Sequence, residues 1–313
     1  MTASAFGAGA PATAAPLPVP DGFYAGVAAE LANPGGSLPG SNDYACEPTR
    51  DHPRPVVLLH DLGATRQSNW ATLVPALANE GHCVYALTYG VVPGKGFESN
   101  GQPLGGTAPI EVSAGELADF VDRVLAAPGT QRAAAAGIGD GTVDLIGHAE
   151  GALVAGYYAK VLGGADNVHE IVSLAPTWKG AGGDVAARYV DRMPAQWRAA
   201  LYDQIPYFLQ VMSGSDVVEA LNAGGAPYAP GVEYTNIATR YNWGIDYTSG
   251  LVPGPQVTNI VVQDGCPTDY SEHDGIGASP RTVAIVLNAL DPAHPRPVPC
   301  GVILPFVGTM VGP

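Results

Sequence analysis

The sequence has few basic residues and few charged residues of any kind. Its 313 residues include 14 Lys and Arg against 29 Asp and Glu, which gives a formal net charge of −15. Nucleic-acid-binding proteins present basic patches, so this balance argues against a nucleic-acid partner and against docking on anionic lipid. Because charged residues make up only 14% of the chain, the surface must be rich in neutral polar groups, glycine and small apolar residues. Such a surface suits a secreted protein that acts on an uncharged substrate.

Long apolar runs and cysteine motifs are also missing. No run approaches the roughly 20 apolar residues of a transmembrane helix, so we predict no transmembrane segment. The four cysteines, Cys46, Cys83, Cys266 and Cys300, form no CxxC pair, and we expect neither a metal site nor a cofactor. An even number of widely spaced cysteines is typical of two disulfides formed in an oxidising compartment. Four buried free thiols are the alternative.

The N-terminal stretch is dominated by Ala, Pro and Gly. It begins "MTASAFGAGAPATAAPLPVP" and has no basic start followed by an apolar core, so it does not have the pattern of an intact signal peptide. We predict an irregular linker over residues 1–37, left after export or cloning. Residues 38–313 are predicted to form one domain, because the chain is 46% apolar and long enough for a sizeable core.

Short apolar runs alternate with segments of helical spacing. The predicted strands cover residues 54–60, 82–90, 142–147, 169–176, 232–241 and 257–264. The predicted helices cover residues 68–81, 113–127, 150–163 and 281–290, with Ser113 and Glu116 as a capping box and Ser279 as an N-cap. This alternation implies a mostly parallel central sheet that is flanked by helices on both faces.

The alternation is interrupted at residues 177–225, which are helical in pattern and rich in aromatic residues. An insertion there would lie over the carboxyl ends of the strands, where α/β proteins bind ligands, so we predict a small helical cap. We expect its aromatic side chains to offer an apolar surface to acyl chains, although a small core within the cap is the alternative. These side chains are Trp178, Tyr189, Trp197, Tyr202, Tyr207 and Phe208.

The stretch "LIGHAEG", residues 145–151, has the strand–turn–helix context of a Gly-x-Ser-x-Gly nucleophile elbow. Gly147 and Gly151 flank the turn, but its centre is Ala149, which has no nucleophilic atom. In the α/β-hydrolase fold, the nucleophile, the acid and the histidine follow one another along the chain. His273 follows a late strand, where the histidine is needed, and the acid is expected in "YNWGIDY", residues 241–247. The oxyanion donors are expected to be the amides of Glu150 and Leu62.

Several stretches together resemble the secreted class 2 lipase/esterase family of actinomycetes, which is distantly like fungal lipase B. The resemblance covers residues 38–305 and is carried by "GSNDYACEP", "HPRPVVLLHDLGAT", "HCVYALTYG", "DLIGHAEG", "YYAKVLGGADNV", "LNAGG", "YTNIATRY", "VTNIVVQDGCPTDYSEHDGI" and "VLNALDPAHPRPVPC". It implies an α/β-hydrolase fold, no cofactor, and hydrolysis of carboxylic esters of lipids or polyesters by a secreted protein, which we expect to be a monomer. It also suggests the disulfides Cys46–Cys83 and Cys266–Cys300.

The chain departs from the family's sequence pattern at the predicted catalytic positions. The family has Gly where this chain has Asp61, Ser where it has Ala149, and a loop one residue longer around 241–247, so that its catalytic Asp aligns with Asn242. Only His273 of the triad is unchanged. Asp246 is the alternative acid, if the shorter loop turns it inward. Substrate contacts are expected from Asp61, His148, Trp178 and Trp243.

Two hypotheses about function follow from these departures. The first is a lipase/esterase-family hydrolase that is inactive because Ala149 replaces the nucleophile, whether by engineering or by natural loss. The second is a natural non-catalytic protein that binds acyl or ester ligands in the retained cleft.

Overall fold

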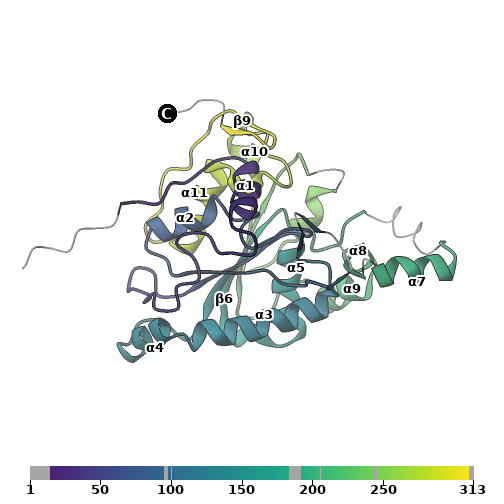
Figure 1. Ribbon diagram of the computed structural model, residues 1–313, viewed down its shortest axis with the longest axis horizontal. Helices are drawn as coiled ribbons and strands as arrows, with labels where there is room; N and C mark the ends of the chain where they lie inside the picture. The colour runs from purple at the N-terminus through teal and green to yellow at the C-terminus, as the bar shows by residue number, and fades with distance from the viewer. Residues whose placement is uncertain are drawn as a thin grey trace, which may run out of the picture.

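A six-stranded parallel sheet forms the centre of the protein (Figure 1). The computed structural model describes residues 15–94, 98–99, 101–182, 192–204, 206–242 and 245–309. The sheet order is β2-β1-β5-β6-β7-β8, and every neighbouring pair of strands is parallel. The strands are β1 (Val56–Leu59), β2 (Val84–Leu87), β5 (Val143–His148), β6 (Val168–Leu174), β7 (Glu233–Ala238) and β8 (Val257–Val261). The predicted α/β-hydrolase fold is therefore confirmed.

Helices cover both faces of this sheet, which explains why β1, with the sequence VVLL, is buried at every residue. One face packs against α3 (Ile110–Leu125) and α5 (Glu150–Gly156), and the other packs against α2 (Leu73–Asn79) and α11 (Pro280–Leu290). In Figure 1, α3 runs along the lower side of the sheet, and α1 (Tyr24–Ala32), α2 and α11 lie on its upper side. Ser279 caps α11 as predicted, because its side chain accepts hydrogen bonds from two backbone amides.

Shorter elements complete the described chain. Two small antiparallel ribbons pair β3 with β4 and β9 with β10. The remaining elements are α1 (Tyr24–Ala32), β3 (Glu98–Ser99), β4 (Gln102–Pro103), α4 (Pro128–Ala135), a π-helical turn (Tyr157–Val161), α7 (Ala195–Gln204), α8 (Pro206–Gln210), α9 (Asp216–Asn222), α10 (Val262–Gly265), β9 (Ile303–Leu304), β10 (Gly308–Thr309), and 3-10 turns at Gly164–Asn167, Tyr247–Gly250 and Ile276–Ala278.

The sequence predicts an irregular linker over residues 1–37. This prediction is wrong for residues 24–32, which form the helix α1 (Tyr24–Ala32). Glu30 of α1 is buried and accepts hydrogen bonds from Thr65 Oγ1 at 2.6 Å and from Gln67 Nε2 at 3.0 Å. A Cβ atom on Gly26 would lie 1.8 Å from the backbone oxygen of Ser68, so glycine permits this close approach. The helix is part of the domain because long-range contacts hold it, which composition alone does not reveal.

The start of α3 also differs from the prediction. The helix begins at Ile110, directly after Pro109, and Ser113 is a buried residue inside it. Glu116, the other half of the predicted capping box, accepts a hydrogen bond from the backbone nitrogen of Gly90 instead. Pro109 has an extended backbone that starts the helix one turn earlier than the serine predicts.

The described part of the 177–225 segment contains the helices α7, α8 and α9 and lies between β6 and β7. Figure 1 shows α7 projecting from one end of the molecule, with α8 and α9 nearer the sheet. Its aromatic residues divide into two groups. Trp178 and Tyr207 are buried, whereas Trp197, Tyr202 and Phe208 are exposed; Tyr189 lies outside the described residues.

Two disulfides join Cys46 to Cys83 and Cys266 to Cys300, so the predicted pairing is confirmed. The first ties the segment before β1 to the start of β2, and the second ties the segment after β8 to the C-terminal region. In the described part of the chain, no helix combines the length and the apolar character needed to span a bilayer.

Candidate active site

Four residues that are far apart in the sequence follow the carboxyl ends of four strands of the sheet. Asp61 follows β1, Ala149 follows β5, Asn242 follows β7 and His273 follows β8. Parallel strands bring these ends to one edge, where α/β proteins place their sites. A cleft of about 290 Å³ opens there. Its lining is Asp61, Leu62, Ala149, Glu150, Thr177, Ala181, Val211, Ile245, His273 and Asp274.

Ala149, the predicted nucleophile position, lies in the turn between β5 and α5 and has a strained backbone. Its φ is 45° and its ψ is −106°, a conformation that costs a non-glycine residue about 1–3 kcal/mol. Both flanking glycines are required by close approach: a Cβ on Gly147 would lie 2.5 Å from the nitrogen of Ala152, and a Cβ on Gly151 would lie 2.3 Å from the oxygen of Leu59. The turn therefore has the sharp strand-to-helix geometry that the sequence predicts for a nucleophile elbow, with the methyl group of Ala149 at its centre.

The two amides predicted as oxyanion donors converge on a single oxygen atom, which belongs to Asp61. Asp61 Oδ1 accepts from the backbone nitrogen of Leu62 at 2.6 Å and from that of Glu150 at 3.3 Å. The backbone nitrogen of Asp61 in turn donates to Asn69 Oδ1 at 2.9 Å. The carboxylate of Asp61 thus occupies both amides that the sequence predicts as oxyanion donors.

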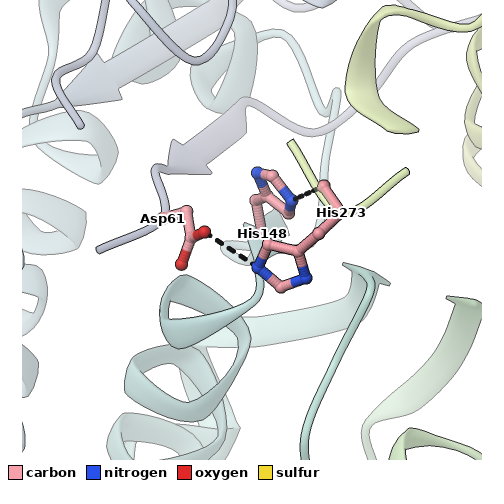
Figure 2. Close-up of side chains that lie close together, drawn as sticks. All are labelled: Asp61, His148 and His273. Atoms are coloured by element: carbon pink, nitrogen blue, oxygen red, sulfur yellow. Dashed lines mark hydrogen bonds and ion pairs between the residues drawn. The ribbon is translucent and has the colours of Figure 1, made fainter. Parts of the chain in front are cut away.

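The other oxygen of Asp61 pairs with His273 (Figure 2). His273 Nε2 lies 3.0 Å from Asp61 Oδ2, and Nδ1 on the opposite side of the ring donates to Asn242 Oδ1. Both ring nitrogens therefore face acceptors, which favours the imidazolium form. Burial alone would raise the pKa of Asp61 and lower that of His273. Their mutual charge and hydrogen bond outweigh burial, so the pKa of Asp61 is lowered to about 2 and that of His273 is raised.

This ion pair makes a pH-dependent contribution to stability. Asp61, whose pKa falls from 3.8 to about 2, contributes above pH 3.8 and loses its contribution as the pH falls toward 2. His273, whose pKa rises above 6.5, contributes fully below pH 6.5 and loses its contribution as the pH rises through the higher value. The ion pair therefore contributes most to stability between about pH 3.8 and pH 6.5. The Asp61 shift corresponds to about 2 kcal/mol.

We expect Asp61→Asn to lower the free energy of unfolding by about 2 kcal/mol at about pH 5 and by less at about pH 9, measured by denaturant titration. The matched control is Asp140→Asn, because the partner Arg54 stays charged at both pH values. A loss that is equal at both pH values for Asp61→Asn would contradict the ion pair.

His148 and His60 lie beside the Asp61–His273 pair, and both rings form hydrogen bonds with other groups of the protein. His148 Nε2 donates to the backbone oxygen of His273 at 2.7 Å (Figure 2). Its Nδ1 lies 3.1 Å from Asn69 Oδ1. His60 Nδ1 donates to the backbone oxygen of Asp61 at 2.7 Å, and burial lowers the pKa of His60 to about 4. Both rings hold the backbone around the site in place.

Asp61, His148 and His273 place possible metal-ligand atoms within 4.8 Å of one another. Hydrogen bonds within the protein already use the ring nitrogens of both histidines and both oxygens of the carboxylate. We therefore assign no metal to this cluster.

Glu150, the first residue of α5, has a buried carboxyl group. Within the described part of the chain, neither of its carboxyl oxygens has a hydrogen-bond partner. Burial, followed by the negative charge of Asp61, raises its pKa well above the ordinary value. Burial therefore favours the neutral form of its side chain, and its contribution to the site is the backbone amide that donates to Asp61.

Two other predicted site residues lie away from the cleft, and a third lies outside the described residues. Trp178 is fully buried in the core and donates from Nε1 to Asn236 Oδ1 at 2.8 Å. Contrary to the prediction, it does not line the cleft. Asp246 is exposed and caps a short 3-10 turn by accepting from the Thr248 amide, so it is not the acid that faces His273. Trp243 lies outside the described residues.

The sequence profile of the Alpha/beta hydrolase family matches residues 56–303 and includes all four strand-end residues. The chain belongs to the alpha/beta hydrolase family. Among solved structures, this alpha/beta hydrolase is similar to Aspergillus fumigatus lipase B, with 16% identity and a TM-score of 0.57; the alignment covers 84% of this chain but only 56% of the lipase. It is also similar to the mature form of Bacillus licheniformis lipase BlEst2, with 12% identity and a TM-score of 0.50, over 82% of this chain and 96% of that one. At these identities the likeness establishes the fold alone. No curated protein sequence matches the chain.

The role of Asp61 in this alpha/beta hydrolase was missed by sequence reasoning, which gave it only a substrate contact. The sequence could have indicated this contact, because Asp61 is an acidic residue directly before Leu62, a predicted oxyanion donor. A carboxylate one residue before that amide can fold back onto it, as the 2.6 Å contact with Leu62 demonstrates.

Proposed function

We propose that this chain is a lipase/esterase-type alpha/beta hydrolase that does not hydrolyse carboxylic esters and instead binds small neutral ester or acyl ligands in its cleft. The observation that carries the proposal is the carboxylate of Asp61 on the two oxyanion amides, opposite an elbow residue that has no nucleophile. An acyl-enzyme needs both an attacking atom at position 149 and a vacant pair of amides.

The state of the histidine supports the same conclusion. His273 lies between Asn242 Oδ1 and an ionised Asp61, and both contacts favour its protonated form. A protonated imidazole cannot take a proton from a hydroxyl nucleophile. Asn242 also lacks the charge with which the usual Asp stabilises the imidazolium during turnover.

The lining of the cleft supports the binding part of the proposal. Ala181, Val211 and Ile245 supply apolar surface, whereas Asp61 and Asp274 supply acidic groups. Burying four or five methylenes there is worth about 3–4 kcal/mol, which gives micromolar to millimolar affinity after the cost of immobilising a ligand. The acidic groups favour neutral esters over fatty-acid anions.

We further propose that the chain is a naturally drifted relative of the secreted actinomycete class 2 family, that it is exported, and that residues 38–313 act as one monomeric domain. The contacts of Asp61 support natural loss, because its carboxylate is matched to two amides and to His273. A single engineered Ala149 would not require them. The two disulfides are compatible with an oxidising compartment.

The test combines turnover with binding. We expect no hydrolysis of nitrophenyl acetate or octanoate above background, and saturable binding of ethyl octanoate by calorimetry that exceeds the binding of octanoate. Val211→Arg should weaken this binding, and Val161→Arg, on an exposed position of the π-helical turn, should not. Turnover that a serine-directed phosphonate blocks would overturn the first part. Absence of saturable binding would overturn the second.

A further inference from the structure

The face of the sheet beneath α11 carries polar residues at positions where a covered strand is ordinarily apolar. Glu170 of β6, Thr235 of β7 and Thr258 of β8 lie on this face, in the amino-terminal halves of three neighbouring strands. Two residues further along β6 and β7, Val172 and Ile237 lie on the same face and belong to the apolar core that α11 covers. The polar positions therefore begin where this core ends.

A cavity of about 520 Å³ lies over these polar positions, which is a size that small organic ligands fill. It opens at the amino-terminal halves of the strands, whereas the cleft beside Ala149 lies at their carboxyl ends. Among the described residues, none lines both spaces. The apolar walls of the cavity come from β8, from α11 and from the segment after α11: Ile260, Ile285, Ala289, Pro292 and Val298.

Glu170 supplies a buried carboxyl group to this cavity. Only 6% of the residue is exposed, and its Oε1 accepts from Thr235 Oγ1 at 2.7 Å. Within the described residues, its Oε2 accepts no hydrogen bond. Burial is the largest influence on this group and raises the pKa of Glu170 to about 7, because an ionised carboxylate in an apolar setting needs a partner. One carboxyl oxygen is therefore left for a ligand.

A register shift in β6 brings a histidine to the same cavity. Val143 pairs with Val168, but Asp144 pairs with Glu170, so His169 has no partner in the ladder between these strands. Such bulges re-aim side chains, and here two consecutive residues, His169 and Glu170, line one cavity although strand neighbours ordinarily face opposite sides. His169 Nδ1 lies 2.8 Å from Asp144 Oδ1.

The charges around the cavity favour a positively charged ligand. Three acidic residues, Asp144, Glu170 and Glu233, face one another here. The basic groups are His169, which pairs with Asp144, and Arg54, which forms an ion pair elsewhere. An anionic ligand would therefore meet more negative than positive charge, whereas a cation would be attracted.

We propose that this cavity binds a small organic cation, an ammonium group on a short apolar chain, with Glu170 as its counter-ion and the chain between β8 and α11. This second binding site goes beyond the proposed function. An ammonium group donates charge-assisted hydrogen bonds to a carboxylate, and the apolar chain leaves water against Ile260 and Ile285. An organic cation fits better than a metal ion, because the described residues gather three possible metal ligands only at Asp61, His148 and His273.

Binding of the cation is coupled to loss of a proton from Glu170. The ammonium group favours the ionised carboxyl, so it binds weakly below the pKa of about 7 and fully above it, and the affinity should rise by about tenfold between about pH 6 and about pH 8. His169 also titrates in this range, because its hydrogen bond to Asp144 raises its pKa. Loss of the His169 proton acts in the same direction. The other acidic groups that face Glu170 are Asp144 and Glu233.

The test titrates the full chain with hexylammonium chloride by calorimetry at about pH 8, with hexanol and sodium hexanoate as probes of equal chain length. We expect saturable binding of hexylammonium that is at least about tenfold tighter than that of either other probe. Glu170→Gln should weaken this binding by about tenfold or more, because the amide oxygen can still accept from Thr235 but carries no charge. The matched control is Glu219→Gln, which removes the same charge from an exposed position of α9 and should change the affinity by less than about twofold.

The proton release gives a readout in the wild type itself. At about pH 6.5, the observed enthalpy of hexylammonium binding should differ between phosphate and MOPS, because the buffer takes up the proton that Glu170 loses. His169→Gln should keep the rise in affinity with pH, and Glu170→Gln should lose it. Ala289→Phe, which fills the cavity and leaves Glu170 in place, should weaken the binding of hexylammonium.

Three results would overturn the proposal. The first is absence of saturable hexylammonium binding, or equal binding of hexylammonium and hexanol. The second is an equal enthalpy in the two buffers, because Glu170 would then not be the counter-ion. The third is binding that Val211→Arg abolishes and Glu170→Gln leaves intact, because the cation would then occupy the cleft.

Discussion

Ester hydrolysis is expected from the triple variant Ala149→Ser, Asp61→Gly, Asn242→Asp, and Ala149→Ser alone is expected to stay close to background. The sequence by itself predicts weak activity for the single change, because His273 and the elbow glycines persist. The contacts of Asp61 lower that expectation. Its carboxylate occupies the amides of Leu62 and Glu150, and its charge favours the protonated form of His273.

The expected gain in the rate of the triple variant over Ala149→Ser comes from two changes: Asp61→Gly vacates the oxyanion amides, and Asn242→Asp places a carboxylate behind His273. Vacating one oxyanion donor is worth about 10²–10³ in kcat, and an Asp behind the histidine is worth about 10⁴. We expect the triple variant to exceed Ala149→Ser by about 10³-fold or more in initial rates with nitrophenyl butyrate. Adding His273→Ala to the triple variant should return the rate to background. Equal rates for the single and triple variants would contradict the blocking role of Asp61.

Trp178→Ala is expected to lower the free energy of unfolding by about 3–5 kcal/mol, and Trp197→Ala is expected to change it by less than about 0.5 kcal/mol. Trp178 is fully buried, and its ring packs edge-on against Tyr228 and Tyr234. Its truncation also leaves the buried Oδ1 of Asn236 without its indole donor. Trp197 is 66% exposed on α7.

Denaturant titration of the two tryptophan variants measures both values, and the pair is matched because both residues lie in the 177–225 insertion. Similar losses for the two variants would show that α7 packs on the body of the protein, contrary to the exposure of Trp197. A small loss for Trp178→Ala together with weakened binding of ethyl octanoate would instead support the substrate contact predicted from the sequence.

The order of the elements was predictable because the information is local. The apolar runs at 54–60, 82–90 and 142–147 match β1, β2 and β5 with small shifts at the ends. A short run of apolar residues predicts a buried strand well when both faces of the sheet are covered, because every side chain of such a strand is then buried. The boundaries were less predictable, and α1 was missed, because tertiary contacts decide whether a weakly patterned Ala- and Gly-rich segment packs.

The candidate site was predictable in its positions but not in its contacts. The chain order placed Ala149, Asn242 and His273 at the edge of the sheet, and the structure brings these strand ends together. The choice between Asn242 and Asp246 was open in the sequence. It depended on which way the 241–247 loop turns, and a one-residue difference in length is enough to change that.

The sequence by itself determined the α/β-hydrolase fold, the turn at Ala149 between Gly147 and Gly151 and, through its resemblance to a family, the disulfide pairing. Only the tertiary structure decided that Asp61 accepts from the amides of Leu62 and Glu150 and pairs with His273. The amide of Glu150 is 89 residues from Asp61 in the sequence, and His273 is 212 residues away. No local pattern encodes such contacts, because they depend on where the parallel strands end and on how each following loop folds back over the sheet.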